Sequence, residues 1–245
     1  MPFLFFNSGY FLYVFLPVLV ITMLATWWVK SAFRKASQIP NMQRITGAQA
    51  ARRILDSAGL TYINIEPTAP IQSRQAAAAS PTLDDHYDPK QKVLRLSPTV
   101  YAEASVAALG VAAHEAGHAI QDAQGYPWMR ARAAIVPAAS IGTNIGWILL
   151  FAGLIFHATG LAWLGVLAFA MGTLFAVLTL PVELNASTRA MQMLTANGLV
   201  DRTEYGQARS VLTAAAFTYI AGLAASVLNL LYYVMLVSGM GRSRN

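Results

Sequence analysis

The sequence contains no cysteine among its 245 residues, which removes several kinds of chemistry at once. Disulfide bonds, thiolate zinc sites and cysteine nucleophiles are all excluded. Any metal ion must therefore be held by histidine and carboxylate side chains. Histidine is itself scarce, because the chain has only four such residues: His86, His114, His118 and His157.

Charged residues are also few, at 11% of the chain, whereas a typical soluble domain has about a quarter. Hydrophobic residues make up 56%, which excludes an ordinary soluble globule and a disordered chain. The formal net charge of +6 could indicate binding to nucleic acid or anionic lipid. In so apolar a chain, basic residues that flank membrane spans explain this charge better. We therefore expect a lipid bilayer as a partner and no nucleic acid.

Uncharged stretches long enough to cross a membrane occur in three places. A span needs about 20 apolar residues, and the first such stretch is Tyr10–Val29. The 50 residues 133–182 contain no Asp, Glu, Lys or Arg, so they are predicted to hold two spans joined by a turn at 157–160. A fourth span is expected over 211–237.

Lys and Arg are distributed unevenly around these four spans. The segments 30–132 and 183–210 fall on one side and carry 15 of the 17 basic residues. Because basic residues favour the cytoplasmic side, we expect a multi-pass protein of the cell membrane with both termini outside. The predicted organisation is a membrane anchor at 1–29, a cytoplasmic region at 30–132, two spans at 133–182, a cytoplasmic segment at 183–210, and a last span with its tail at 211–245.

Residues 30–132 are predicted to form a small α+β domain in an otherwise mainly α membrane protein. Thr46 and Gln49 form a capping box that begins a helix, and Gly59 ends it. A long helix is expected over 99–123. Between these helices we predict a strand at 61–65, a surface loop at 67–81, a turn at 88–91 and a strand at 92–96.

The expected long helix contains the sequence His-Glu-Ala-Gly-His at 114–118, which is an HExxH motif. Residues four apart lie on one face of a helix, so His114 and His118 can bind one zinc ion. Glu115 is placed to act as the general base on a zinc-bound water. The neighbouring residues are small or apolar, and burying these polar groups without a metal would be unfavourable. Gly117 suggests that another element approaches this helix closely.

A catalytic zinc site also needs a third protein ligand and an open position for water. His157 is expected at the outer turn, on the other side of the membrane, whereas His86 stays possible. Glu183 is the better candidate, because it is the first charged residue after the 50 uncharged residues. Two crossings would return the chain to the side of the HExxH helix, where Glu183 could meet the two histidines.

Four segments of the chain resemble the YugP-like family of membrane zinc metallopeptidases. They are TGAQAARRILDSAGL at 46–60, DHYDPKQKVLRLSPTVY at 85–101, VAAHEAGHAIQDAQGY at 111–126 and PVELNASTRA at 181–190. More distantly, the chain resembles the HtpX-type and CAAX prenyl proteases. The resemblance implies a gluzincin-type site with His114, His118 and Glu183 on zinc. The HtpX-type pattern has an Asp four residues after the ligand Glu, where this chain has Ser187, which can still hydrogen-bond a zinc histidine.

Together these features predict a membrane zinc endopeptidase that hydrolyses peptide bonds at the cytoplasmic face. Its partners would be peptide or protein substrates, with membrane proteins among the candidates. His86, Tyr87 and Arg189 are the candidates to stabilise the oxyanion, and the strand Val93–Leu96 could pair with an extended substrate.

The alternative is a non-catalytic membrane scaffold or transporter subunit with a structural metal site. Glu115 favours the enzyme, because a structural site has no use for a general base. The predicted spans also lack ionisable side chains apart from His157 at a turn, whereas a transporter usually places polar groups within its spans.

Overall fold

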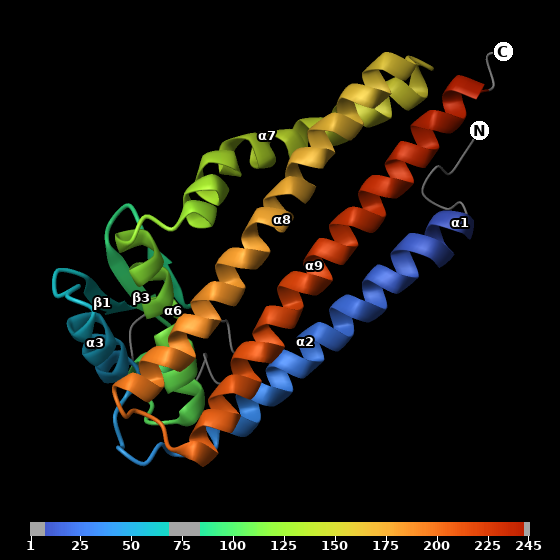
Figure 1. Ribbon diagram of the computed structural model, residues 1–245. Helices are drawn as coiled ribbons and strands as arrows, with labels where there is room; N and C mark the ends of the chain where they lie inside the picture. Colours follow the sequence, from blue (N-terminus) through green and yellow to red (C-terminus); the bar gives the residue numbers. More distant parts are fainter. Residues whose placement is uncertain (1–7, 69–83, 243–245) are drawn as a thin grey trace. The chain divides into compact units, whose positions relative to one another are not determined.

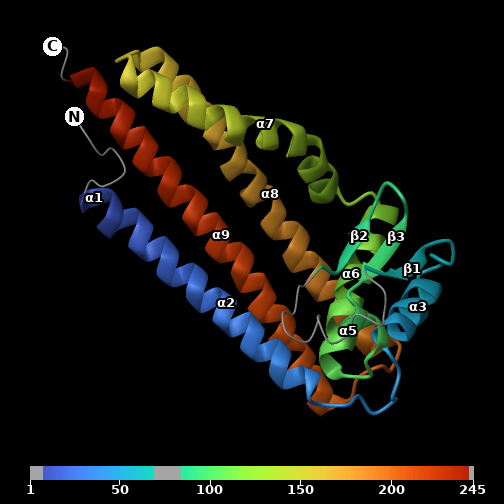
Figure 2. The same ribbon diagram turned by 180° about the vertical axis from the view of Figure 1, so that it is seen from behind.

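The computed structural model describes residues 8–68 and 84–242, whose helices and strands are shown in Figures 1 and 2. The chain divides into two units, each with dense internal contacts. Unit 1 contains Met1–Thr26, Pro127–Pro181 and Phe217–Asn245, and unit 2 contains Trp27–Tyr126 and Val182–Ala216. Three long helices contribute residues to both units.

Long helices make up nearly all of the described part of unit 1. The chain enters them through α1 (Ser8–Tyr10) and a π-helical turn, η1 (Phe11–Phe15). The long helices are α2 (Leu16–Ser37), α7 (Pro127–Ile155), α8 (Thr159–Ala196) and α9 (Arg202–Arg242). Among the described residues, four helices are long and apolar enough to cross a membrane, which confirms the number of spans expected from the sequence.

Helices α7, α8 and α9 pack together through one apolar cluster in unit 1. Its buried members are Leu150, Ala162, Val166, Tyr233 and Val237. The expected turn between α7 and α8 is present, and His157 adopts a left-handed φ of 54° within it. Gly165 lets α7 and α8 approach closely, since a Cβ at this position would lie 2.5 Å from the backbone nitrogen of Leu150.

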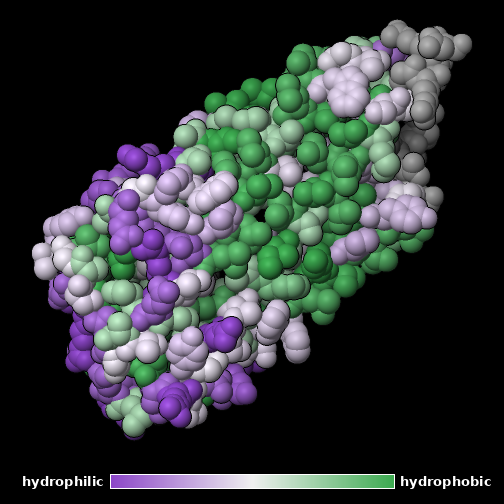
Figure 3. Space-filling model, viewed as in Figure 1, coloured by the Kyte–Doolittle hydropathy of each residue, from purple (hydrophilic) through white to green (hydrophobic). Residues whose placement is uncertain are grey.

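The surface of unit 1 is strongly apolar. Large hydrophobic side chains such as those of Ile148, Leu167 and Met235 are 68%, 64% and 66% exposed. Figure 3 shows hydrophobic residues over the visible surface of these helices, whereas hydrophilic residues gather over unit 2. An exposed apolar surface of this extent indicates contact with a protein partner or with lipid. Because these helices are long enough to cross a bilayer, the surface is expected to contact lipid. The chain is therefore a mainly α membrane protein with a small α+β part.

The first helix wholly within unit 2 is α3 (Gly47–Ser57), and its predicted capping box is present. The Thr46 hydroxyl accepts a hydrogen bond from the backbone N–H of Gln49, and the Gln49 side-chain oxygen accepts one from the backbone N–H of Thr46. The predicted stop is present as well, because Gly59 follows the helix with a φ of 75°, in the left-handed region that glycine tolerates.

The single helix expected over 99–123 is wrong, because the chain forms two helices there. These are α5 (Pro98–Ala102) and α6 (Val106–Ala123). Glu103 has extended backbone angles, and Ser105 caps α6 by accepting a hydrogen bond from the backbone N–H of Ala108. Ser105 also forms an isolated β-bridge with Pro40, which the break makes possible. The HExxH segment therefore lies within a separate helix that has its own N-terminal cap.

Three short strands form a sheet in unit 2, in the order β1-β3-β2. The strands are β1 (Asn64–Pro67), β2 (His86–Asp88) and β3 (Val93–Leu96). β1 is parallel to β3. β2 is antiparallel to β3, and the predicted turn connects these two strands. The first strand starts three residues later than predicted. The loop predicted at 67–81 lies almost wholly outside the described residues.

The central position of β3 corrects the expectation that Val93–Leu96 could pair with an extended substrate. Both of its edges are already occupied, by β1 on one side and by β2 on the other. The backbone groups of β3 are thus used within the sheet. Among the described strands, β2 pairs on one side only.

Helix α6 lies at the centre of unit 2 and is buried along most of its length. Helices α3 and α5 and the sheet pack around it. Large side chains that are fully buried in this unit include Ile54, Leu55, Leu94, Leu96 and Leu109. Helix α8 meets α6 at Gly117, where an added Cβ would lie 2.8 Å from the backbone oxygen of Ala186. Glycine is needed for this approach, which is the close contact that the sequence predicts.

Candidate metal centre

Three metal-ligating side chains converge in unit 2, two from α6 and one from α8. One ligand atom from each of His114, His118 and Glu183 can be chosen so that all lie within 4.8 Å of one another. The Glu183 Oε2 atom is 3.2 Å from Nε2 of His114 and 3.4 Å from Nε2 of His118. Two ligands at zinc–ligand distances of about 2.0–2.1 Å in a tetrahedral site are about 3.3 Å apart. The two distances from the carboxylate to the imidazoles therefore match the ligand spacing of a tetrahedral zinc ion.

The local structure of the two helices explains why these donors meet. His114 and His118 are one turn apart on α6 and so share a face. Gly117, between them in sequence, allows the α8 backbone at Ala186 to lie directly against α6. Glu183 is one turn before Ala186, on the same side of α8. The backbone contact thus brings the carboxylate into line with the two imidazoles.

The second ring nitrogen of each histidine also has a partner. The hydroxyl of Ser187 lies 3.2 Å from Nδ1 of His114, and the side-chain oxygen of Gln121 lies 3.0 Å from Nδ1 of His118. Both Nε2 atoms are consequently directed at Glu183. Outer partners of this kind fix the orientation and tautomer of a ligating imidazole. Ser187 occupies the place that the sequence comparison with HtpX-type proteases assigns to it.

Gln121 is a site residue that the sequence reasoning missed. It is 0% exposed, and its amide nitrogen donates to the backbone oxygen of Val182 and to Oδ1 of Asn185, both at 2.9 Å. Arg189 Nε in turn donates to Asn185 Oδ1 at 2.7 Å. Since both partners of the amide nitrogen are acceptors, the Gln121 oxygen must face His118. The sequence does indicate this contact, because residues three apart on a helix, such as His118 and Gln121, are neighbours on its surface.

The hydrogen bonds of Gln121 fix the tautomer of His118, and this tautomer shows whether the site suits a cation. The Gln121 oxygen can only accept, so Nδ1 of His118 carries a proton and the neutral ring presents a lone pair at Nε2. That lone pair faces the Glu183 carboxylate, which also has only lone pairs to offer. Burial lowers the pKa of His118, but the Glu183 and Glu115 carboxylates and the Gln121 side chain together more than offset this, and the pKa is raised. The site therefore favours a positive charge, which zinc would supply.

His114 shows the opposite balance. Burial is the largest influence on its ring and lowers its pKa, so the neutral imidazole is the favoured form. A neutral imidazole is the form that ligates a metal. A site with one neutral ring, one ring that attracts positive charge and one carboxylate has the donor set of a His₂Glu zinc centre.

Glu115 lies next to the first histidine and is also buried, at 8% exposed. Burial raises the pKa of its carboxyl group to about 8. The backbone N–H of Tyr87 in β2 donates a hydrogen bond to this carboxyl group. The edge of the sheet therefore meets the HExxH helix at the residue expected to act as the general base.

The three residues predicted as oxyanion candidates each have a hydrogen-bond partner outside the three donors. His86 is exposed and its Nδ1 lies 2.8 Å from the backbone oxygen of Asp84. The Tyr87 hydroxyl donates to Asp122 at 2.7 Å. Arg189 is bound to Asn185 and Gln124. Arg189 instead supports the Gln121 network, and His86 is not part of the ligand cluster.

Comparisons with known proteins agree with this geometry. Residues 11–238 match a family model described as "Putative neutral zinc metallopeptidase". The chain is 36% identical over 235 residues to the "Putative membrane protease YugP" of Bacillus subtilis (strain 168), and the alignment covers 96% of this chain and 99% of that protein. No solved structure matches the chain. The family match extends over the three converging donors and the four apolar helices.

Proposed function

The chain belongs to the neutral zinc metallopeptidase family, and we propose that it is a membrane endopeptidase that cleaves peptide bonds at the cytoplasmic face. One observation carries this proposal: the donors of His114, His118 and Glu183 lie within 4.8 Å of one another, with the buried carboxyl group of Glu115 next to them in sequence. A purely structural zinc site is usually closed by four protein ligands, whereas three leave a position for water.

The proposed mechanism assigns a separate task to each residue of α6 and α8. His114, His118 and Glu183 would hold the zinc ion, which when bound lowers the pKa of a water and polarises the substrate carbonyl. Glu115 takes the proton from the attacking water and passes it to the nitrogen of the leaving amine. Burial raises the pKa of the Glu115 carboxyl group to about 8, which brings it near neutral pH, where a group that both accepts and releases a proton is most effective. Ser187 and Gln121 keep the imidazoles oriented.

Strand β2 takes the substrate-binding role that the sequence had suggested for Val93–Leu96. It pairs with β3 on one side and packs against α6, and the backbone N–H of Tyr87 is close enough to Glu115 to lower the pKa of that carboxyl group. Strand β2 therefore lies beside the general base. An extended peptide added to the edge of β2 would place its backbone beside the reacting groups.

The direct test combines zinc analysis with proteolysis of a protein substrate by the purified full-length chain. We expect the parent to contain zinc and to cleave, and we expect Glu115→Gln to keep the metal while activity falls by about 10²–10⁴-fold. Undiminished activity in this variant would remove Glu115 from the mechanism. Zinc binding without any cleavage by the parent would favour the scaffold with a structural metal.

The cytoplasmic location of the site is tested with single cysteines, since the chain has none of its own. Cysteine at Asp56, in unit 2, should react with an impermeant thiol reagent only after the cells are opened. Cysteine at His157, in the turn between α7 and α8, should react in intact cells. The proposed orientation is abandoned if the two positions react in the opposite order.

A further inference from the structure

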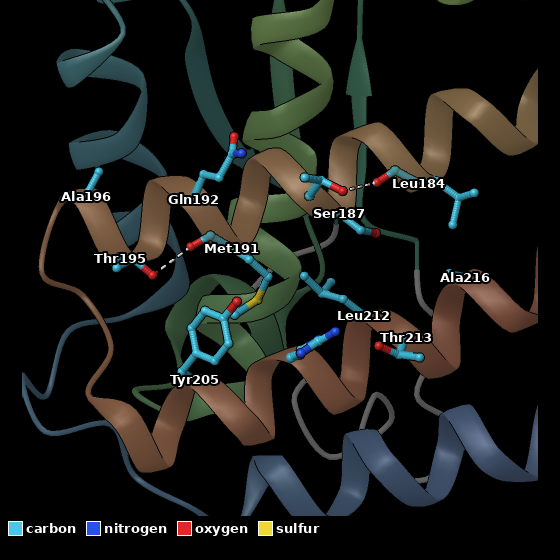
Figure 4. A pocket seen from close by; sticks show the side chains of 12 residues that line it. Leu184, Ser187, Met191, Gln192, Thr195, Ala196, Tyr205, Leu212, Thr213 and Ala216 are labelled. Carbon is cyan, nitrogen blue, oxygen red and sulfur yellow. Dashed lines mark hydrogen bonds between the residues drawn. The ribbon is translucent and has the colours of Figure 1, made fainter.

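A groove of about 790 Å³ runs between α8 and α9 within unit 2 (Figure 4). Its walls are largely apolar, through Leu184 and Met191 of α8 and Leu212 and Ala216 of α9. Leu184 is 43% exposed there. The groove thus offers apolar surface that the described part of the chain leaves open.

The groove adjoins the metal centre directly. Ser187 lines it, and the hydroxyl of Ser187 lies 3.2 Å from Nδ1 of His114. Figure 4 shows Ser187 and Met191 directed from α8 toward α9, with Leu212 opposite Ser187 and Tyr205 further along. Any chain that occupies the groove would therefore lie next to one of the zinc histidines.

Among the described residues that line the groove, Arg209 is the only one with a charged side chain. No acidic side chain lines it, and within the described residues Arg209 has no ion pair or hydrogen bond to its guanidinium group. This contrasts with Arg189 on the other helix, whose guanidinium group is bound to Asn185 and Gln124. The groove thus combines apolar walls with an uncompensated positive charge.

We propose that this groove binds the substrate on one side of the scissile bond, and that Arg209 selects an acidic side chain of the substrate. Arg209 precedes Leu212 by three residues, about 4.5 Å along the helix axis. An extended peptide advances about 3.3 Å per residue. The selected Asp or Glu would therefore lie one or two residues along the peptide from the residue that contacts Leu212.

This inference rests on the proposed function and identifies a substrate class for the same site. A phospholipid could also bring a negative charge and apolar chains to the groove. The position of Ser187 against His114 favours the peptide, because it makes the groove continuous with the reacting groups. A carboxylate is also well matched to a guanidinium group, which can bind it with two parallel hydrogen bonds.

The test uses quenched fluorescent peptides of apolar residues that are blocked at both ends, so that no terminal carboxylate is present. A single Glu is moved through three positions on each side of the scissile bond, and each peptide has a matched Gln version. With the zinc-loaded full-length protein, we expect Glu to raise kcat/KM about fivefold over Gln at one position, as for a partly exposed ion pair. An equal rate for Glu and Gln at every position would overturn the proposal while leaving the proposed function intact.

Variants of Arg209 assign the preference to this side chain. Arg209→Gln should reduce the Glu-to-Gln ratio to about one, Arg209→Lys should keep it above one, and Arg209→Glu should favour a Lys peptide at the same position. Arg202→Gln is the matched control, because Arg202 is a basic residue of α9 outside the groove. A ratio that stays the same in Arg209→Gln would overturn the assignment.

A binding measurement separates failure of this inference from failure of the proposed function. Zinc-loaded Glu115→Gln protein should bind the labelled Glu peptide more tightly than the Gln peptide, and adding Arg209→Gln should remove the difference. This outcome would support the groove even if the parent cleaved nothing. If Arg209→Gln instead changes only the retention of phosphatidylglycerol over phosphatidylcholine in nanodiscs, the groove is a lipid site and the inference is wrong.

Discussion

Both units bring helices close together through glycine, but they do so for different ends. In unit 1, Gly165 allows α8 to lie against α7, and the outward side chains of these helices are apolar and exposed. In unit 2, Gly117 allows α8 to lie against α6, and the gap beside it holds polar groups. Close helix packing at a glycine thus joins α7 and α8 in unit 1 and aligns the candidate metal ligands in unit 2. Changes in unit 1 should affect stability, whereas changes in unit 2 should affect metal binding.

The largest effect is expected from removing a ligand in unit 2. Glu183→Ala should lower zinc affinity by more than about 100-fold, because even the loss of a ligand's outer partner costs 10–100-fold. Activity should be lost with the metal, unlike in Glu115→Gln. Competition with a zinc chelator measures the affinity, and Glu103→Ala in the same unit is the control. Full zinc affinity in Glu183→Ala would exclude it as a ligand.

The glycine comparison can be tested directly with two matched substitutions. Gly117→Ala would place a Cβ 2.8 Å from the Ala186 oxygen, and Gly165→Ala would place one 2.5 Å from the Leu150 nitrogen. Overpacking of this kind costs about 1–3 kcal/mol. We expect both variants to unfold at lower temperature, but only Gly117→Ala to lose zinc affinity. Equal zinc affinity in the two variants would break the distinction between the units.

A smaller effect is expected from Gln121, which supports a ligand without touching the metal. Gln121→Leu keeps a similar volume but removes the acceptor for His118 Nδ1 and the donor to Val182. Zinc affinity should fall by about 10-fold, at the low end of the range for outer partners. Gln192→Leu, at an exposed position of α8, should leave the affinity as it is. A similar loss in both variants would mean that Gln121 acts only through the stability of the fold.

The smallest effect concerns Asp85 of unit 2, whose carboxyl group accepts hydrogen bonds from the backbone and hydroxyl of Ser97. Burial raises its pKa from 3.8 to about 6. The folded state therefore favours the protonated form, so this contribution to stability is complete below about pH 4 and is lost as the pH rises to about 6.

Asp85→Asn should abolish that pH dependence. Between pH 4 and pH 7, the free energy of unfolding of the parent should fall by about 1 kcal/mol relative to the variant. This value is smaller than the pKa shift alone would give, because solvent screens the partly exposed carboxyl group. Thermal unfolding of both proteins across this range measures the difference. A constant difference would show that Asp85 does not titrate in this interval.

The sequence predicts the parts of the molecule that depend on local pattern or on the bilayer. The spans follow from composition, because lipid requires long apolar helices. The convergence of His114 and His118 follows from their spacing on one helix. The proximity of Glu183 to them was expected from topology, because two crossings were predicted to return the chain to the side of the HExxH helix. The capping box at Thr46 and the stop at Gly59 are local signals and are present.

What the sequence does not predict depends on contacts between distant segments. The break between α5 and α6 has no glycine or proline at its centre, and the pairing of Ser105 with Pro40 accompanies it. A serine before an apolar run is a possible N-cap, so Ser105 was a usable signal. The order of the strands, which makes β2 an edge, depends on a parallel pairing across an intervening segment. Gln121 becomes recognisable only when Val182 and Asn185 lie beside it.

The contact between Gly117 and the Ala186 backbone has a consequence for how the protein can change over time. Main-chain atoms are the same whatever side chain they carry, so the distance between α6 and α8 at this point does not depend on the volume of neighbouring residues. Substitutions in the surrounding apolar core can then alter the thermal stability while the donor atoms keep their spacing. The spacing of the donor atoms is therefore expected to tolerate substitutions elsewhere in the core. The exception is position 117, where a side chain would push α6 and α8 apart.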